Sequence, residues 1–487
     1  MKNQTLICSL LIVAGFVTIG RAEDRPNILL LLADNWAWPH ASIAGDPVVK
    51  TPRFDEFARE GVLFSNTYCQ VPSCSPARAV LLTGQACHRL RDAANLWGSW
   101  PHSLRTYPEL LEDAGYVVGQ EGKGWGPGVI IQSTSARRTR NPSGRKFPSF
   151  KSFLDAKPKG RPFCFWFGSH NPHQPWRAEK KHYEGLLVDK LKLPPYLPDH
   201  PEVRQALLNY YAEVQAFDAE IAELLDELER RGLADNTLVV VMGDNGWQTP
   251  RGLANVYDAG TRTPMAIRWP RRIRPGRRTD AFVSFEDLAP TFLEAAGLKR
   301  DSKVTGKSLL PLLNEDSKTE WRDAIFLERE RHANVRSGDG CYPCRAIRTK
   351  EFLYVWNLQP DRWPAGDPEM YFAVGPFGDV DNTPYKTVIL SQRDKPEMRK
   401  YFELGFGKRP EHELYHLLTD PDQVVNVASN PKYANTIKKL RSRVEAWMKR
   451  TRDPRAADSQ TTVFDKFKYY GGPPSAKRLA PARAYKP

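Results

Sequence analysis

Continuous apolar runs recur along the N-terminal part of this sequence. The run at residues 25–34 reads RPNILLLLAD, and similar runs cover 162–170, 236–245 and 264–270. An uninterrupted apolar stretch of this length is typical of a parallel strand that is buried on both faces. We therefore predict a buried sheet, with polar residues such as Asp34 at the ends of its strands.

Helical patterns separate these runs. Residues 103–116 form one, and from Leu207 to Leu228 apolar residues recur every three or four positions before Gly232. Strands that alternate with helices predict an α/β fold, with a large, mostly parallel sheet sandwiched by helices. In such folds, ligands bind beyond the carboxyl ends of the strands.

The pattern changes after about residue 310. Residues 346–358 alternate like one solvent-facing antiparallel strand, and residues 435–450 have a helical pattern. We therefore predict a smaller C-terminal α+β subdomain. The expected division is a signal peptide (1–22), a main α/β domain (23–315), the α+β subdomain with its antiparallel sheet (316–450) and a basic tail (451–487).

The N-terminus has the pattern of a secretory signal. Lys2 precedes an apolar run, and Gly20 and Ala22 supply small residues for cleavage. The alternative is a buried N-terminal strand or helix. No other stretch is apolar enough to cross a membrane. We expect an exported protein, periplasmic or extracellular, without stable membrane insertion.

The formal net charge is +14, concentrated at residues 137–146, at 268–278 and in the tail from Lys466 to Pro487. Excess positive charge suits a polyanionic partner, such as nucleic acid, anionic lipid or a sulfated glycan. No nucleic-acid module is recognisable, and export argues against that partner. For each run taken alone, a solvated surface is the alternative.

Two of the cysteines, Cys341 and Cys344, form an isolated CYPC. A zinc site would need two further ligands at a matching spacing, and the sequence offers none. We expect a local disulfide or two free thiols, since export permits oxidation.

Two Asp-Asn pairs follow strand-like runs: Asp34 with Asn35, and Asp244 with Asn245. Carboxylate and amide oxygens are ligands of hard cations such as Ca²⁺ and Mg²⁺, and the two pairs are able to converge on one ion. The alternative is that these residues merely favour the turns after strands.

The stretch VPSCSPARAVLLTG (71–84) decides between these readings. It matches the sulfatase signature, Cys-x-Pro-x-Arg followed by x-x-x-Leu-Thr-Gly, at every fixed position. From about residue 25 to 430 the chain resembles the formylglycine-dependent sulfatases of the alkaline phosphatase superfamily. Within that family it resembles most the heparan N-sulfatase (sulfamidase) group, through CSPAR, TGQACH, the GK…GPG segment and CYPCRAIRTK.

The resemblance implies an alkaline-phosphatase-like fold and a sulfuric ester hydrolase that acts on O- or N-sulfate of a sulfated carbohydrate. It implies a calcium ion, rather than magnesium, held by Asp34, Asn35, Asp244, Asn245 and the modified Cys74. It also implies that a formylglycine-generating or anaerobic sulfatase-maturing enzyme oxidises Cys74 to formylglycine before folding is complete.

The implied chemistry follows from the hydrated aldehyde. One hydroxyl coordinates the metal and attacks sulfur, and the other later collapses to the aldehyde and expels sulfate. Arg78 would hold the diol, and Lys123 would stabilise the developing anion. His173 would protonate the leaving atom, with His170 as its competitor. His88, in TGQACH, matches a substrate-side histidine of the same group.

The chain departs from the family pattern at several positions. Asn35 replaces an aspartate, Trp125 replaces the histidine that serves as base, and Leu253 replaces a lysine or arginine. Arg251 stands close enough in sequence to Leu253 to reach the same sulfate. Ala77 replaces the commoner serine. These changes keep two alternatives open: a phosphoester hydrolase of the same superfamily, or a catalytically impaired protein that binds sulfated glycans.

Overall fold

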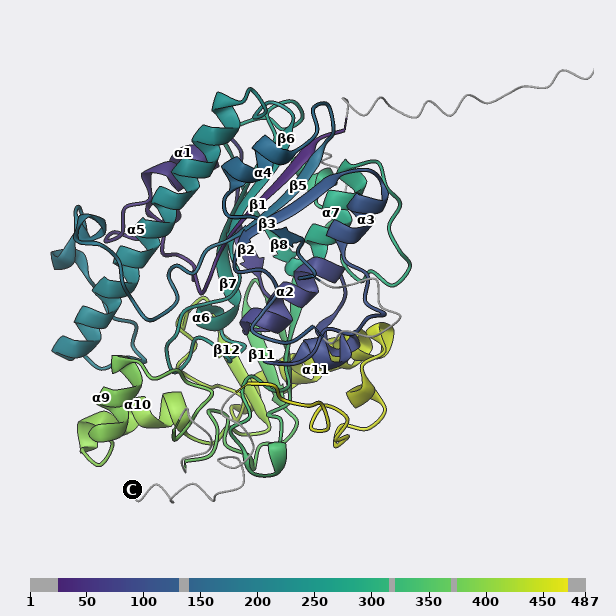
Figure 1. Ribbon diagram of the computed structural model, residues 1–487. Helices are drawn as coiled ribbons and strands as arrows, with labels where there is room; N and C mark the ends of the chain where they lie inside the picture. The colour runs from purple at the N-terminus through teal and green to yellow at the C-terminus, as the bar shows by residue number, and fades with distance from the viewer. Residues whose placement is uncertain (1–24, 131–139, 315–319, 369–374, 472–487) are drawn as a thin grey trace, which may run out of the picture.

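A large sheet lies between two layers of helices in the computed structural model, which describes residues 25–130, 140–314, 320–368 and 375–471 (Figure 1). Within these residues the sheet has eight strands. The predicted signal peptide lies outside the described residues. In sheet order the strands are β4 (Arg145–Lys146), β3 (Val117–Gly122), β5 (Phe163–Gly168), β1 (Asn27–Ala33), β6 (Thr237–Gly243), β7 (Arg262–Arg268), β2 (Val62–Tyr68) and β8 (Arg277–Ser284).

Strand β1 lies in the middle of the sheet and is buried on both faces. Leu30 and Leu32 belong to the apolar core on one face, whereas Leu29 and Leu31 belong to the core on the other. Successive side chains of a strand point to opposite faces, so an unbroken apolar run is what a strand covered on both sides requires. This confirms the α/β fold class predicted from the sequence.

The helices cover the two faces as Figure 1 shows. The predicted helix from Leu207 to Leu228 is part of the 30-residue helix α5, and the one at 103–116 is the shorter α3, which begins at a capping box formed by Thr106 and Glu109. One layer contains α1 (Pro52–Arg59), α4 (Phe150–Ala156) and α5 (Pro201–Arg230), and the other contains α2 (Cys74–Thr83), α3 (Tyr107–Asp113) and α7 (Leu288–Ala295).

Strand β7 corrects one expectation. The apolar run at 264–270 was expected to be another parallel strand, but β7 is antiparallel to both β6 and β2. The chain reaches β7 through residues 244–261, in which the one α-helix is the four-residue α6 (Asp258–Thr261), so this connection lacks the long helix that usually carries a parallel crossover.

A second sheet, antiparallel and four-stranded in the described residues, packs beside the first. The expected single strand at 346–358 is wrong: it is a hairpin of two strands that turns at Lys350 and Glu351. The expected helix at 435–450 is present as α11, which covers this sheet. The strands of this sheet are β9 (Ala324–Arg329), β10 (Cys344–Thr349), β11 (Phe352–Asn357) and β12 (His412–His416). The α-helices after residue 309 are α8 (Leu310–Leu313), α9 (Pro384–Ser391), α10 (Pro396–Phe406) and α11 (Ala434–Thr451).

The described part of the predicted basic tail packs on the body of the protein. Asp453, Arg455 and Phe464 are all buried. In the described residues, no helix combines the length and the apolarity that a membrane span requires. The predicted domain boundaries remain predictions.

Candidate active site

Four neighbouring parallel strands, β3, β5, β1 and β6, end at the same edge of the large sheet. The register pairs Ala33 of β1 with Gly243 of β6, so that the next residues, Asp34 and Asp244, emerge side by side. Gly122 of β3 is likewise paired with Gly168 of β5, ahead of Lys123 and the segment 169–173. The carboxyl edge of the sheet therefore gathers the polar residues that the sequence places after these strands.

Glycine is required where β3 and β5 end. A Cβ atom on Gly168 would lie 1.8 Å from the carbonyl oxygen of Lys123. Gly122 has φ +68°, and a Cβ atom there would lie 2.1 Å from the carbonyl oxygen of Gly168. This close approach of the two backbones brings Lys123 next to the end of β5.

Helix α2 brings the signature residues to this edge. Cys74 is its first residue, and Gly84 ends it in the left-handed conformation with φ 66°. Cys74 and Arg78 are four positions apart and therefore lie on the same helix face. Every side chain of the helix is buried, so the helix is held on all sides.

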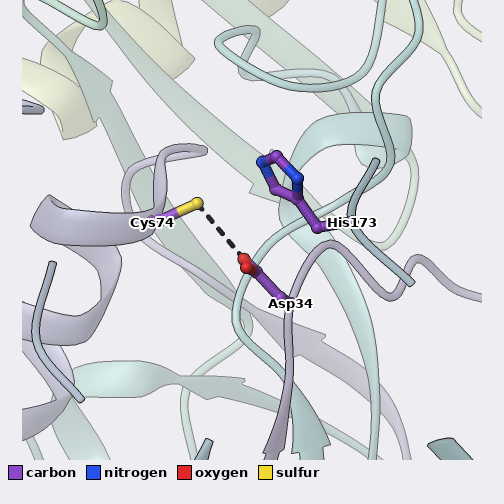
Figure 2. A group of neighbouring side chains, drawn as sticks. All are labelled: Asp34, Cys74 and His173. Carbon is purple, nitrogen blue, oxygen red and sulfur yellow. Dashed lines mark hydrogen bonds between the residues drawn. The ribbon is translucent and has the colours of Figure 1, made fainter. Parts of the chain in front are cut away.

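The side chains of Asp34, Cys74 and His173 point toward one another (Figure 2). Sγ of Cys74 lies 3.4 Å from Oδ1 of Asp34, and ligand atoms of all three residues lie within 4.8 Å of one another. Nζ of Lys123 lies 2.5 Å from Oδ2 of Asp34. One carboxylate thus contacts both the thiol and the ammonium group.

Arg78 connects the strand ends beneath Cys74. Its Nε donates to Oδ2 of Asp244 at 2.9 Å, and its Nη1 donates to the carbonyl oxygens of Lys123 and Gly124. Nη2 lies 3.7 Å from Oδ1 of Asp34 and is buried without a hydrogen-bond partner. The guanidinium is therefore fixed in place with one donor left free.

Charge and burial set the protonation of these groups. Burial raises the pKa of the Asp34 carboxyl, but Lys123, His173 and Arg78 outweigh it and hold that pKa well below its usual range. Burial and the charge of Asp34 raise the pKa of the Cys74 thiol well above its usual value. Asp34 is therefore ionised near neutral pH and Cys74 is a protonated thiol.

The Asp-Asn pairs offer a set of hard oxygen donors. Nδ2 of Asn245 donates to Oδ1 of Asn35 at 2.7 Å, and the backbone N–H of Asn35 donates to Oδ1 of Asp244 at 2.8 Å. Oδ1 of Asn245 is buried without a hydrogen-bond partner. A buried amide oxygen without a donor, beside two carboxylates, fits a hard divalent cation, because such an ion accepts oxygen ligands from all of these groups.

A cavity of about 970 Å³ opens beside Asp34. Cys74, Asp34, Lys123 and His173 all contribute to its lining. The rest of the lining is mixed in charge and includes His170, Trp97, Leu253, Arg177, Lys181, His182, Glu179, Glu220, His332 and Asp381. Cys74 therefore faces a cavity that is open to a ligand much larger than a single anion.

The sequence profile of the family described as Sulfatase matches residues 26–298, more than half of the chain. The chain belongs to the sulfatase family. A second profile, described as N-sulphoglucosamine sulphohydrolase, C-terminal, matches residues 243–369. Sulfatases are sulfuric ester hydrolases, and this sulfatase has the eight-stranded and four-stranded sheets described above.

Relatives of known function cover almost the whole sulfatase. It is 29% identical to the human N-sulphoglucosamine sulphohydrolase, over 92% of this chain and 94% of the relative. It is 27% identical to an ulvan-active sulfatase of Formosa agariphila, over 88% of this chain and 75% of the relative. A solved structure of a protein bound to its substrate D-glucosamine-2-N,6-O-disulfate shares the fold, with TM-score 0.61, 21% identity and coverage of 89% of this chain and 99% of that chain.

The structure locates the residues that depart from the family pattern. Trp125 is buried away from the cavity and packs edge-on against Trp100, with ring centroids 5.1 Å apart. Leu253 lines the cavity and is 3% exposed. Leu253 has no polar side-chain atom, and Trp125 has only an indole N–H donor that lies outside the cavity lining, so neither is able to accept a proton there.

His88 and Arg251, predicted to bind substrate, are not brought to the cavity. His88 is buried against Glu328, with its Nδ1 3.0 Å from Oε2, and against the ring of Trp447. Arg251 lies with its guanidinium carbon 3.8 Å from the centre of the Tyr257 ring and donates to the carbonyl oxygen of Leu404. Both are held by the packing of the second sheet and the segments around it, which the local sequence did not reveal.

Several cavity residues were not found from the sequence. His332 follows β9 and Asp381 precedes α9, and both line the cavity. Asp381 accepts a hydrogen bond from Gln248, which follows β6. Only the fold brings these distant segments together, and none carries a recognisable motif. In the described residues all the cysteines are free thiols, so Cys341 and Cys344 fit the second of the two expectations for CYPC.

Proposed function

We propose that this sulfatase is exported and removes sulfate groups from a sulfated carbohydrate, with a formylglycine derived from Cys74 as its nucleophile and calcium as its metal. One observation carries the proposal. Cys74, Asp34, Lys123 and His173 lie together in the lining of one large cavity, and Arg78, on the same helix as Cys74, is fixed by Asp244. A nucleophile position, an ionised carboxylate, an ammonium group and an imidazole are the groups that sulfate transfer requires.

The state of Cys74 supports its modification. As a thiol it is kept protonated, and a protonated thiol is a poor nucleophile. Its side chain is buried with 3% exposure, so a maturing enzyme would reach it only before the chain has folded. Sγ stands where the modified residue would carry its oxygen.

The metal would be held by Asp34, Asn35, Asp244 and Asn245 together with the modified residue 74. Ca²⁺ accepts many oxygen ligands in flexible geometry, whereas Mg²⁺ seldom occupies a site built from protein groups alone. The donor set therefore favours calcium. When bound, the ion would withdraw charge from the sulfate oxygens and lower the pKa of a coordinated hydroxyl.

The chain's own groups have distinct roles in this proposal. Hydrated formylglycine supplies the hydroxyl that attacks sulfur. Nη2 of Arg78, the donor left free, holds that hydroxyl group in position. Lys123 keeps its proton because Asp34 outweighs the effect of burial on its pKa, so it carries positive charge toward the sulfate oxygens. His173 gives a proton to the leaving oxygen or nitrogen.

The substrate class rests on the cavity and on the relatives. The cavity is large enough for more than one sugar unit, and Lys123, His170, Arg177, Lys181 and His182 give it basic groups for an anionic ligand. The ulvan-active and N-sulphoglucosamine relatives are named for sulfated carbohydrates. Export rests on the N-terminal signal pattern, and fractionation with N-terminal sequencing of the mature protein tests it.

Co-expression with a maturing enzyme tests the catalytic part of the proposal. Mass spectrometry of the peptide that contains residue 74 measures conversion to formylglycine. The converted protein is then assayed for sulfate release from defined sulfated oligosaccharides, with an aryl sulfate and an aryl phosphate alongside. We expect sulfate release that Cys74→Ala abolishes. Full conversion without release from any sulfated substrate would refute the proposal, and cleavage of the phosphate alone would assign a phosphoester hydrolase.

A further inference from the structure

The hydroxyl of Ser73 is turned away from the helix that it precedes. Ser73 is the N-cap residue of α2, where a serine usually accepts a hydrogen bond from the first turn, yet it makes no such bond. Its Oγ lies 2.8 Å from Nδ1 of His332 instead. The residue next to Cys74 thus holds an imidazole that comes from 259 positions away.

His332 lines the same cavity as Cys74. Its side chain is 5% exposed. Because Nδ1 is bonded to Ser73, the other ring nitrogen, Nε2, is the one left for a ligand. When Nδ1 carries the proton and donates to Ser73 Oγ, Nε2 has a free lone pair. The hydroxyl of Ser73 is able to accept this bond, so the contact fits the tautomer in which Nε2 is able to accept a proton.

The charged groups around His332 leave it neutral. Burial lowers the pKa of its imidazole. The negative charges of Asp379 and Asp381 raise that pKa, whereas the positive charges of Arg329 and Arg336 lower it further, and the net shift is downward. Asp379 is itself paired with both of these arginines, at 2.5 Å each. His332 is therefore an unprotonated imidazole near neutral pH.

The proposed reaction needs a group to accept a proton after sulfate transfer. Lys123 donates to Asp34, and Arg78 donates to Asp244 and to two carbonyl oxygens, so both groups act as donors here. Trp125 lies outside the cavity and has no basic atom. His173 is assigned to the leaving group, which makes it the rival for this second proton.

We propose, on the basis of the function proposed above, that Nε2 of His332 is the base that releases sulfate from residue 74. In this step the bond between the residue 74 side-chain carbon and the sulfate oxygen breaks, and its electron pair leaves with sulfate. The remaining hydroxyl on that carbon becomes the aldehyde carbonyl, and its proton passes to Nε2 of His332. Addition of water to the aldehyde then restores the hydrate.

The test compares converted wild type with His332→Gln, and with His102→Gln as a control at an exposed histidine outside the cavity. We expect His332→Gln to lower turnover about 100-fold or more, as for loss of a general base. The decisive readout is not turnover: peptide mass spectrometry after brief exposure to substrate should find sulfate still bonded to residue 74. Wild type and His102→Gln should retain none.

Exogenous imidazole provides a second readout. In His332→Ala, added imidazole should enter the cavity, restore turnover and clear the retained sulfate, which a merely structural histidine would not predict. Turnover of His332→Gln within about threefold of wild type, without retained sulfate, would overturn the proposal and assign the proton to His173. Slow turnover with neither retained sulfate nor rescue would also overturn it.

Ser73→Ala keeps the test decisive should the His332 variants fail to fold. It leaves the imidazole in place but removes its tether, and we expect turnover about tenfold lower with partial sulfate retention on residue 74. A wild-type rate without retention in Ser73→Ala would contradict the role of His332. If converted wild type itself releases no sulfate from any substrate, the proposed function fails, and the inference fails with it.

Discussion

Nε of Arg78 donates to Oδ2 of Asp244 at 2.9 Å, although the two residues are 166 positions apart. Neither side chain has any exposed surface. The same guanidinium holds the carbonyl oxygens of Lys123 and Gly124. Arg78 therefore locks helix α2 to the ends of β3 and β6, and it fixes Cys74 relative to both.

Arg78→Lys should break this lock. A lysine ammonium is a single point of charge and does not reproduce the planar fork that serves Asp244 and both carbonyls. We expect the free energy of unfolding to fall by about 3 kcal/mol or more, as for a broken buried ion pair, and sulfatase activity to be lost. Urea unfolding measures the first effect. Arg59→Lys, on the exposed end of α1, is the control and should change stability by less than about 0.5 kcal/mol.

Calcium should stabilise the folded protein through Asn245. At a concentration about 100-fold above Kd, a ligand adds about 2.7 kcal/mol to the free energy of unfolding. We expect calcium to raise Tm, a chelator to reverse the rise, and magnesium to act more weakly. Asn245→Ala should abolish most of the shift, because it removes the amide oxygen that is buried without a partner.

Asn66→Ala provides the control for the calcium experiment. Asn66 lies on β2, outside the cavity lining, and its amide donates to the carbonyl oxygen of Asp280. Its calcium-dependent shift should equal that of wild type. An equal shift in Asn245→Ala would contradict the assignment of Asn245 as a metal ligand.

The parts that the sequence predicted are those in which a short pattern carries the information. A buried parallel strand needs an unbroken apolar run, so β1, β5 and β6 were expected, and with them the positions of Asp34 and Asp244 at adjacent strand ends. The same kind of run does not reveal the direction of a strand. This is why β7 was expected to be parallel.

The parts that were not predicted depend on contacts between distant segments. His332 reaches the cavity only because β9 packs near the large sheet, and no local motif marks it. His88 follows the sulfatase signature closely in the sequence, but its side chain is hydrogen-bonded to Glu328, 240 positions later. A motif locates a residue along the chain, whereas its surroundings are decided by the fold.

Trp125 should contribute to stability and not to catalysis. It is buried in the core beneath α2 and packs edge-on against Trp100. Trp125→Ala should lower the free energy of unfolding by about 3–5 kcal/mol, as for other buried aromatic residues. Urea unfolding measures the loss, with Trp356→Ala, half-buried on β11, as a control that should lose less.

Replacing Trp125 by the histidine usual in the family provides a sharper form of this prediction. Trp125→His would place an imidazole in the apolar core instead of the cavity, so we expect lower stability without faster turnover. A clear gain in turnover would show that residue 125 reaches the reacting group, and it would contradict the packing seen here.

His88 should make stability depend on pH. Nδ1 lies 3.0 Å from Oε2 of Glu328, and Nε2 lies 3.3 Å from the carbonyl oxygen of Thr451. Both neighbours only accept, so both ring nitrogens donate when the imidazole is protonated. Burial lowers the pKa of His88, but Glu328 and Asp453 outweigh it and raise that pKa above its usual value.

The sign of the pH effect follows from this shift. Since the pKa is higher in the folded state, the stabilisation by His88 is complete below the unfolded pKa of about 6.5 and is lost as pH rises through the folded pKa. His88→Gln should therefore lower the free energy of unfolding by about 3 kcal/mol at acidic pH and by less as pH rises. Urea unfolding over a pH series, with His102→Gln as the control, measures the difference. A difference that grows with pH would mean that His88 is buried as the neutral imidazole.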